Sequence, residues 1–315
     1  MRRNFEIKSF NFIAWNWEKD VVIEDVKKEI DYQVEKLYVN TITFAFAAVQ
    51  EHCYSTDIYW KGEHMPNEEE LAELISYSQS KGLKVILKPM LNVMDGYWRA
   101  YIRFFDEDVP CEPKWRDWFN NYNNYLIHYG KLCEKYNVDT LIIGCELVGT
   151  DHRENEWRNL VKELRKIYSG KLTYNCDKYQ EHNVKWWDVL DYISSSGYYP
   201  IGTIKKELDR IEEVSKKYNK SFFFAEAGCP SVKGAAKIPN DWTIIGDGAS
   251  SEEEQYDFYN EILQESLKRS FISGFCFWDW PMKSPKNIDG KLTNEYSVKF
   301  KLAEGIIRDY FKDSY

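Results

Sequence analysis

The chain has 315 residues, 43% of them hydrophobic, which is enough for one large α/β barrel or for two ordinary domains. Acidic residues outnumber basic ones by 51 to 42, the formal charge is −9, and no stretch gathers Lys and Arg into a stripe, so nucleic acid and anionic membranes are not expected partners. No apolar run is long enough to span a bilayer, and no uninterrupted apolar segment follows Arg2 and Arg3, so we expect a soluble, cytoplasmic protein.

Apolar runs of strand length alternate with longer helical patterns along the whole chain. The predicted strands cover residues 8–15, 40–49, 83–91, 139–147, 170–176, 192–199, 221–228 and 273–280. The predicted helices cover 20–36, 67–82, 114–136, 154–168, 203–218, 251–270 and 302–311, with only a short helix at 181–190. Asn67 is placed to cap the second of these helices. Ser251 and Glu254 predict a capping box at the sixth.

Eight βα units with near-continuous apolar strands predict a single (β/α)8 barrel, one α/β domain over residues 1–315. An open, doubly wound sheet is the alternative, but no GxGxxG or GxxxxGKS follows a predicted strand. The longest loops, 50–66, 92–113 and 229–250, all follow the C-terminal ends of strands. A barrel builds its active site at that end, so we expect the site there.

Cysteine and histidine patterns give no sign of a disulfide framework or a metal site. The seven cysteines are scattered without a CxxC pair, and the five histidines are dispersed without HxxxH or HExxH. We therefore expect no metal and no cofactor. Aromatic residues make up 17% of the chain, which suits a rich core or a cleft whose flat faces stack against sugar rings.

Polar residues at the C-terminal strand ends are the candidates for chemistry, because the rest of each strand packs in the core. Glu146 and Glu226 end the fourth and seventh strands, and these positions face each other across a closed barrel. Hydrolysis of a glycoside needs such a pair: one carboxyl protonates the leaving oxygen, and the other attacks the anomeric carbon or activates water. The further candidates, for substrate contact, are Trp15, His52, Lys88, Asn92, Cys145, Asp177, Tyr198, Trp278 and Trp280.

The two roles require different surroundings. A general acid must stay protonated near neutral pH, whereas a nucleophile must stay ionised. Tyr198 lies at the end of the sixth predicted strand, beside the seventh, and is placed to donate its phenolic hydrogen to Glu226, which favours the ionised form. A separation of about 5–5.5 Å between the two carboxyl groups would mean retention through a covalent glycosyl-enzyme.

This pattern resembles a known group of enzymes. Glutamates at the ends of strands 4 and 7 of one (β/α)8 barrel are the mark of glycoside hydrolase clan A. Within it the chain is most similar to glycoside hydrolase family 113, whose characterised members are retaining endo-β-1,4-mannanases. The similarity runs from KSFNFIAW through LKVILKPML, LIIGCEL and FFFAEAG to GFCFWDW, and so covers nearly the whole chain. It implies a retaining hydrolase that cleaves β-1,4-linked mannan or manno-oligosaccharides.

The resemblance also implies roles for single residues. Glu146 looks like the acid/base, and Glu226 looks like the nucleophile that Tyr198 holds. Lys88 and Asn92 look like residues that bind hydroxyls of the reacting sugar. His52 lies just beyond the second strand, near the rim, where it is placed to touch substrate.

Two further positions concern the reacting sugar. Trp278 or Trp280 looks like the tryptophan that forms the floor of its subsite, and strand parity does not separate them. Most of the clan has asparagine before the acid/base, where its amide binds the sugar 2-hydroxyl, but this chain has Cys145. A thiol is a poor hydrogen-bond partner, so this chain loses the hydrogen bond from that position to the sugar 2-hydroxyl. The loss matters less for mannose, whose 2-hydroxyl is axial, than for glucose or xylose, whose 2-hydroxyl is equatorial.

Other functions remain open from sequence. Lys88 is compatible with a Schiff-base lyase, although a lysine that binds substrate or pairs with a carboxylate fits better beside a glycosidase pair. A non-catalytic carbohydrate-binding barrel, or a hydrolase of xylan or glucan oligosaccharides, are further alternatives. Trp60, Trp98 and Trp242 are either stacking platforms or loop anchors, and they bear on endo or exo action. We expect a monomer whose partner is a β-linked oligosaccharide or polysaccharide.

Overall fold

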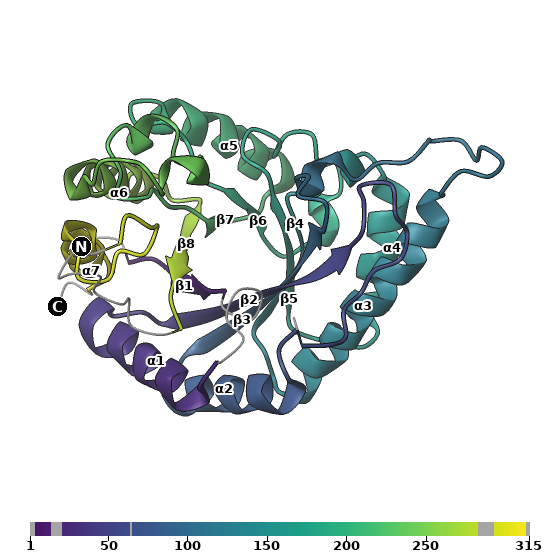
Figure 1. Ribbon diagram of the computed structural model, residues 1–315, viewed down its shortest axis with the longest axis horizontal. Coiled ribbons are helices and arrows are strands. Elements are labelled where there is room, and N and C mark those ends of the chain that lie inside the picture. The colour runs from purple at the N-terminus through teal and green to yellow at the C-terminus, as the bar shows by residue number, and fades with distance from the viewer. Residues whose placement is uncertain (1–3, 14–20, 64, 283–292, 313–315) are drawn as a thin grey trace.

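A computed structural model describes residues 4–13, 21–63, 65–282 and 293–312 of the chain. Within these residues, eight parallel strands pair in sequence order and the last pairs with the first, so the sheet closes into a barrel. The helices lie around the outside of this ring (Figure 1). The predicted (β/α)8 barrel is confirmed.

The strands lie close to their predicted positions. They are β1 (Ile7–Phe12), β2 (Thr41–Gln50), β3 (Lys84–Val93), β4 (Thr140–Cys145), β5 (Lys171–Cys176), β6 (Ile193–Ser196), β7 (Phe222–Glu226) and β8 (Ile272–Trp280). β6 is shorter than its predicted span, 192–199, because its pairing with β7 ends where Ser196 meets Glu226. Tyr198 therefore lies in the loop beyond the strand.

The helices also follow the prediction, except at residues 181–190. They are α1 (Ile23–Leu37), α2 (Glu68–Ser80), α3 (Trp115–Lys135), α4 (Glu154–Arg165), α5 (Ile204–Tyr218), α6 (Glu252–Leu267) and α7 (Leu302–Phe311). Asn67 caps α2 by accepting the N–H of Glu69. The predicted short helix at 181–190 is only one 3-10 turn, η4 (Trp187–Val189).

The predicted capping box of α6 forms only in part. Ser251 Oγ accepts the N–H of Glu254, as expected. The Glu254 carboxylate, however, accepts the N–H groups of Gly234 and Ala236. The reciprocal half of the box was therefore wrong, because this carboxylate satisfies backbone donors in the loop after β7 instead.

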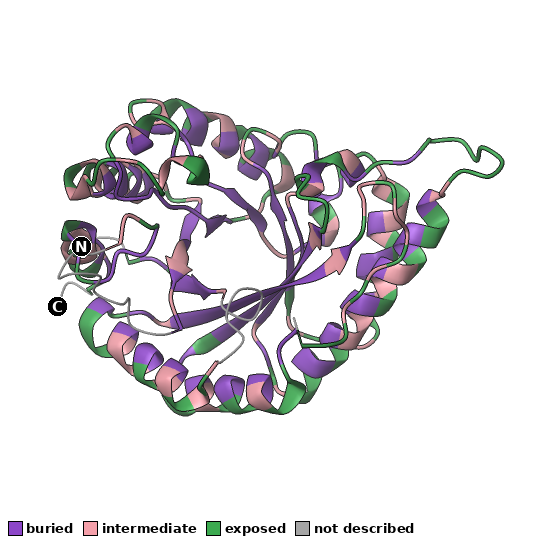
Figure 2. Cartoon of the chain, in the orientation of Figure 1, coloured by how far each residue is buried: buried purple, intermediate pink, exposed green. Residues whose placement is uncertain are grey.

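Most of the core lies between the strands and the helices, and Figure 2 shows that the strands are largely buried while each helix has a buried side and an exposed side. Phe222 and Phe224 of β7 point outward into it, while Phe223 and Ala225 point into the barrel. This two-sided burial explains the continuous apolar run of the strand. The barrel interior is apolar near the strand starts, with Ile7, Ile86, Ile142, Phe223, Ala225 and Cys276.

Buried hydroxyl groups lie in the barrel interior at the level of these apolar residues. Ser9 and Thr43 share a hydrogen bond of 2.8 Å, and Thr173 and Ser194 share one of 3.1 Å. Each of these hydroxyl groups has a partner, which removes most of the cost of burying it.

Register shifts at three strand ends decide which side chains enter the barrel. β4, β7 and β8 each carry one more residue than a partner strand, within 142–145, 224–226 and 277–280. An extra residue of this kind reverses the alternation of the side chains that follow it. Cys145 and Glu226 therefore point inward, and Trp280 points outward, each against simple alternation.

A cavity of about 350 Å³ opens at the opposite end of the barrel, lined by strand starts that include Thr41, Lys84 and Thr140. Among the described residues, no helix is both long and apolar enough to cross a membrane.

Candidate active site

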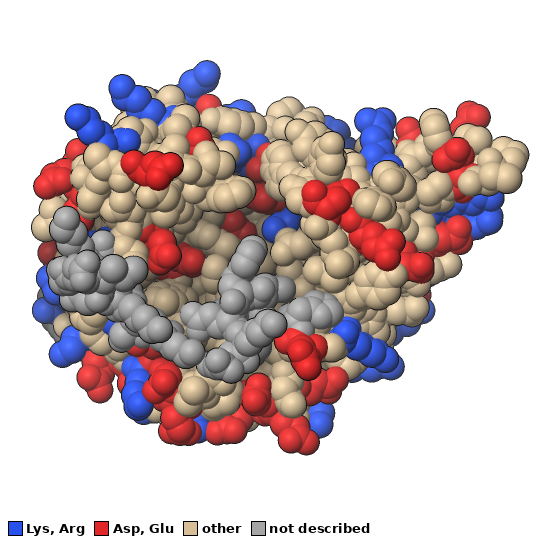
Figure 3. All heavy atoms as spheres, in the orientation of Figure 1, with Lys and Arg blue, Asp and Glu red and all other residues tan. Residues whose placement is uncertain are grey.

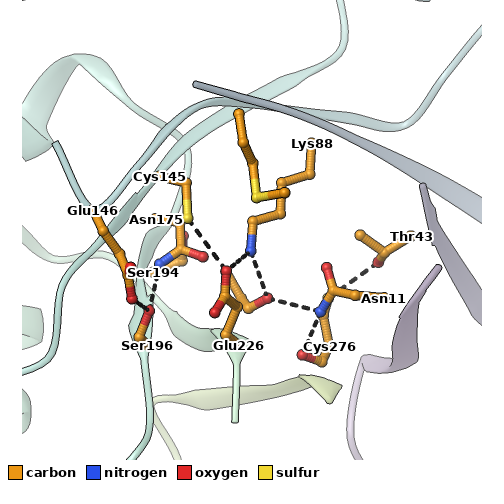
Figure 4. A network of polar contacts seen from close by, with 12 residues as sticks. Asn11, Thr43, Lys88, Cys145, Glu146, Asn175, Ser194, Ser196, Glu226 and Cys276 are labelled. Carbon is orange, nitrogen blue, oxygen red and sulfur yellow. Dashed lines mark hydrogen bonds and ion pairs between the residues drawn. The ribbon is translucent and has the colours of Figure 1, made fainter. Parts of the chain in front are cut away.

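Glu146 and Glu226 reach into one polar network at the C-terminal end of the barrel (Figure 4). Glu226 is the last residue of β7, and Glu146 directly follows β4. Glu146 has a φ of 53°, in the left-handed region, and its N–H donates to the carbonyl of Asn175 at 2.8 Å. Such a conformation is uncommon for a residue with a side chain and often marks a functional position. The surface is hollowed near the barrel centre, with acidic side chains beside the hollow (Figure 3).

Glu226 is buried among hydrogen-bond donors. Lys88 Nζ and Cys145 Sγ donate to its Oε1, the thiol at 3.2 Å. Tyr198 donates its hydroxyl to Oε2 at 2.8 Å, as the sequence predicted. Lys88 is fully buried and forms an ion pair with Glu226, so of the two roles considered for this lysine, binding substrate or pairing with a carboxylate, the structure shows the second.

These donors set the charge of Glu226. Burial by itself would raise the pKa of this carboxyl, but the charge and hydrogen bond of Lys88 outweigh burial, with further help from the charge of Arg99 and the hydroxyl of Tyr198. The pKa of Glu226 is therefore held below its usual range. Glu226 is ionised at neutral pH although it is only 5% exposed.

Glu146 has a more open setting. It is half-buried, and it accepts hydrogen bonds from Ser196 Oγ at 2.7 Å and from Trp98 Nε1 at 3.2 Å. Asn175 donates to the same Ser196 hydroxyl at 3.1 Å, which fixes that side chain in turn. Among the described residues, no lysine or arginine donates a hydrogen bond to Glu146.

Asp177, just past β5, adds negative charge near Glu146. Burial, followed by the charge of Glu146, raises the pKa of Asp177 to about 7. Its Oδ1 atom is buried and accepts no hydrogen bond from the described residues. Lys178 Nζ approaches that oxygen only to 3.8 Å.

A half-buried guanidinium lies close to both glutamates. Arg99, in the turn η2 (Arg99–Tyr101) after β3, donates from Nη2 to Asn92 Oδ1 at 2.7 Å and from Nη1 to Cys145 Sγ at 3.2 Å. Asn92 is therefore engaged by a protein group in this structure. Cys145 joins Arg99 on one side to Glu226 on the other.

The comparisons with known proteins agree with this geometry. The sequence model of Glycoside Hydrolase Family 113 matches residues 10–301. The chain belongs to glycoside hydrolase family 113. It is thus a glycoside hydrolase, and its substrate is a carbohydrate.

Solved structures of the family superpose on the whole chain. One, a family 113 β-1,4-mannanase, is 44% identical, with a TM-score of 0.92 over 99% of this chain and 100% of its own. Another, the family 113 β-mannanase of Alicyclobacillus acidocaldarius in complex with ManMIm, is 30% identical, with a TM-score of 0.89 over 98% and 97% of the two chains. The β-glucuronidase of Ruminococcus gnavus is 14% identical, with a TM-score of 0.65 over 99% of this chain and 51% of its own, and shares the fold alone. Among curated proteins, none matches this chain.

In this family 113 chain the two candidate floor tryptophans have different places. Trp278 is half-buried, and its ring lies 5.5 Å from Lys88 Nζ, on the inner side of the barrel. Trp280 is fully buried on the outer side, where its Nε1 donates to Glu29 of α1 at 3.0 Å. The prediction that Trp280 could meet a sugar was therefore wrong, because the extra residue in β8 turns it away from the cleft.

Other sequence candidates lie at the rim or beyond the described residues. His52 Nδ1 contacts Asp95 Oδ2 at 2.8 Å, and its ring stacks on Tyr54. Trp15 lies outside the described residues. Trp60 packs against His128 and Tyr125 as a loop anchor. Trp242 is 71% exposed.

Sequence reasoning missed two residues of this family 113 site. Ser196 was hidden in the run ISSS, where only its place at the strand end distinguishes it from its neighbours. Arg99 had no signal, because it lies within a long loop and nothing in its neighbourhood indicates that it turns inward. Trp98 was noted as a loop aromatic, but its hydrogen bond to Glu146 could not be foreseen.

Proposed function

We propose that this enzyme is a retaining hydrolase of β-1,4-linked mannan or manno-oligosaccharides, with Glu226 as the nucleophile and Glu146 as the acid/base. The contrast between the two carboxylates carries the proposal. Glu226 is buried and kept ionised by Lys88, while Glu146 is more open and has only neutral donors among the described residues. The β-mannanases among its structural relatives support the choice of glycan.

The chemistry then takes two displacements. Glu226 attacks the anomeric carbon while Glu146 gives its proton to the departing oxygen, which leaves a covalent glycosyl-enzyme. In the second step Glu146 takes a proton from water, and the hydroxide so formed releases the sugar from Glu226. The ionised state of Glu226 in the free enzyme is what the first step requires.

Cys145 and Trp278 supply the expected features of a mannose site. The Cys145 thiol donates to Glu226 and so occupies the place from which an asparagine amide would bind an equatorial 2-hydroxyl. The Trp278 ring, beside Lys88, is the surface on which the reacting sugar stacks.

The product profile tests the glycan and the stereochemistry together. Mannohexaose, xylohexaose and cellohexaose are digested side by side, and proton NMR follows the anomer that forms first. We expect release from mannohexaose, with the β-anomer appearing before mutarotation. First formation of the α-anomer would contradict retention, and no release from any of the three would contradict the β-1,4-glycanase assignment.

Azide rescue tests the two roles. In Glu226→Ala, azide should take the place of the nucleophile and give an α-mannosyl azide from an activated mannoside. In Glu146→Ala, azide should attack the glycosyl-enzyme and give a β-mannosyl azide. The reverse pattern would exchange the roles.

A further inference from the structure

The turn that follows β3 sends two consecutive side chains to the two glutamates. Trp98 donates to Glu146 at 3.2 Å, and Arg99 donates to the Cys145 thiol, which donates in turn to Glu226. One short segment outside the barrel thus contacts the surroundings of both carboxylates. The mechanism above uses neither residue.

Arg99 is unusual in its partners. Its hydrogen bonds go to the Asn92 amide oxygen, the Cys145 sulfur and, at 3.8 Å, the Met90 sulfur. None of the ion pairs found among the described residues includes Arg99. A guanidinium withdrawn from water among neutral acceptors is costly unless negative charge compensates it from nearby. The charges that do so here are those of Glu146 and Glu226.

We propose that Arg99 is a positioning residue for the nucleophile: through Cys145 it fixes the Glu226 carboxylate, and η2 couples this support to the acid/base through Trp98. This inference rests on the proposed function, in which Glu226 is the nucleophile and Glu146 the acid/base. The guanidinium touches neither carboxylate through a hydrogen bond, so its effect passes through the thiol and through its charge.

A close backbone contact sets the position of the turn. A Cβ atom on Gly149 would lie 2.3 Å from the carbonyl oxygen of Ile102 and 3.0 Å from that of Ala100. Gly149 belongs to η3 (Val148–Thr150), which follows Glu146. Only a residue without a side chain permits this approach. The same contact therefore ties η2 to the strand that carries the acid/base.

Several charged and titratable groups face Glu226, and Arg99 is one of them. They are Lys88 from β3, Cys145 and Glu146 from the end of β4, Tyr198 after β6, Cys276 from β8, and Tyr296. Lys88 remains when Arg99 is removed, so Glu226 should still ionise, but at a higher pH than in the wild type. A change of pH profile therefore separates this role from a merely structural one.

Two substitutions of Arg99 test the proposal, with Arg103→Met as the control, an exposed arginine of the same loop. In Arg99→Met we expect kcat on manno-oligosaccharides to fall about 10²-fold, the loss that a misplacement of about 1 Å produces. The acidic limb of kcat/KM should move to higher pH. Arg99→Lys should keep the limb near its wild-type position and lose less activity, and Arg103→Met should match the wild type. The proposal would be overturned if Arg99→Met and Arg99→Lys lost the same amount of activity and the acidic limb of kcat/KM stayed at its wild-type pH in both.

A double-mutant cycle tests the path through the thiol. If Arg99 acts through Cys145, the variant carrying Arg99→Met and Cys145→Ala should lose little more activity than the worse single variant. Losses that multiply would contradict this path. Should Arg99→Met fail to fold, Gly149→Ala provides the second test. It leaves both side chains in place but displaces η2, and we expect a fall in kcat and the same shift of the acidic limb; an unchanged profile would overturn the role of the turn.

A titration without substrate separates this inference from the proposed function. Carbon-13 NMR of labelled glutamate reports the ionisation of Glu226 in free wild-type enzyme and in Arg99→Met. We expect the midpoint to rise in the variant even if no mannan is cleaved. If the wild type cleaves mannan but the Glu226 midpoint is the same in Arg99→Met, only the role of Arg99 is overturned. If the midpoint is higher in Arg99→Met but the wild type cleaves no mannan, only the proposed function is overturned.

Discussion

The surroundings of Glu226 and Glu146 differ although both glutamates end a strand of one barrel. Glu226 is closed in by the Lys88 ammonium, a phenol and a thiol, whereas Glu146 stands at the mouth with a serine and an indole. Both carboxylates accept hydrogen bonds, so the presence of hydrogen-bond donors does not distinguish the two glutamates. The difference lies in the charge of the donors, and a buried cation is what keeps a buried carboxylate ionised.

The two glutamates also differ in the ionisable residues that lie just beyond their hydrogen-bond partners. Behind Glu226, Arg99 adds a second positive charge. Near Glu146 lies Asp177, a second carboxyl group whose own pKa is raised to about 7. The outer partner of Glu226 is thus a cation, whereas the outer partner of Glu146 is another carboxyl group.

The largest expected effect comes from removing each glutamate in turn. Glu226→Ala should lower kcat/KM on the order of 10⁴-fold or more on every mannoside, because no group replaces the nucleophile. Glu146→Ala should lose as much on mannohexaose but little on a dinitrophenyl mannoside, whose leaving group needs no proton. Steady-state kinetics on the two substrates check this. Equal behaviour of the two variants would remove the contrast between the carboxylates.

Removal of Lys88 tests the cation beside Glu226, the proposed nucleophile. Lys88→Met should lower kcat/KM on the order of 10²–10³-fold, as loss of a preorganised donor does, and move its acidic limb to higher pH. It should also destabilise the fold by about 3–5 kcal/mol, because it leaves a buried charge without its partner. Urea unfolding measures the stability, and Lys84→Met, at the exposed start of the same strand, is the control.

The pH dependence of that destabilisation has a definite sign. The folded-state pKa of Glu226 lies below its unfolded value, so its contribution is present above the unfolded pKa and is lost as pH falls through the folded pKa. The stability difference between wild type and Lys88→Met should therefore shrink on acidification. A difference that grows as pH falls would show that Lys88 does not hold Glu226 ionised.

A smaller effect is expected at the other carboxylate. Ser196→Ala removes one hydrogen bond that positions Glu146, worth about 1 kcal/mol, so kcat/KM on mannohexaose should fall about fivefold. Ser195→Ala is a matched control, since Ser195 donates to Glu181 on the outer side of the barrel at 2.8 Å. Comparable kinetic losses in the two variants would mean that Ser196 acts on folding rather than on Glu146.

The smallest effect should come from Asp177. Asp177→Asn replaces a carboxyl group near Glu146 that ionises only at about neutral pH, so kcat/KM should change only a few-fold at neutral pH. Because the pKa of Asp177 is raised to about 7 in the fold, its stabilising contribution is complete below the unfolded value and is lost as pH rises through about 7. The variant should accordingly gain stability over wild type on going from acidic to neutral pH. Urea midpoints at both pH values measure this, and the absence of any gain would contradict the raised pKa.

The sequence by itself determined the barrel and the two glutamates at the ends of its fourth and seventh strands. Strand-length apolar runs in regular alternation with helices leave few other architectures, and a glutamate at the end of a buried run such as SFFFAE has to lie where packing stops. Tyr198 was also within reach, because it follows the strand next to β7 and a phenol is a suitable donor for a carboxylate.

Only the tertiary structure decided which other side chains join the glutamates. Alternation along a strand predicts facing residues only while the register is regular, and β4, β7 and β8 each carry an extra residue at the end where the site lies. For that reason Trp278 and Trp280 could not be separated in advance. Arg99 shows the second limit: its position depends on the backbone contact between Gly149 and Ile102, and a contact between two loops that are distant in sequence leaves no periodic pattern in either.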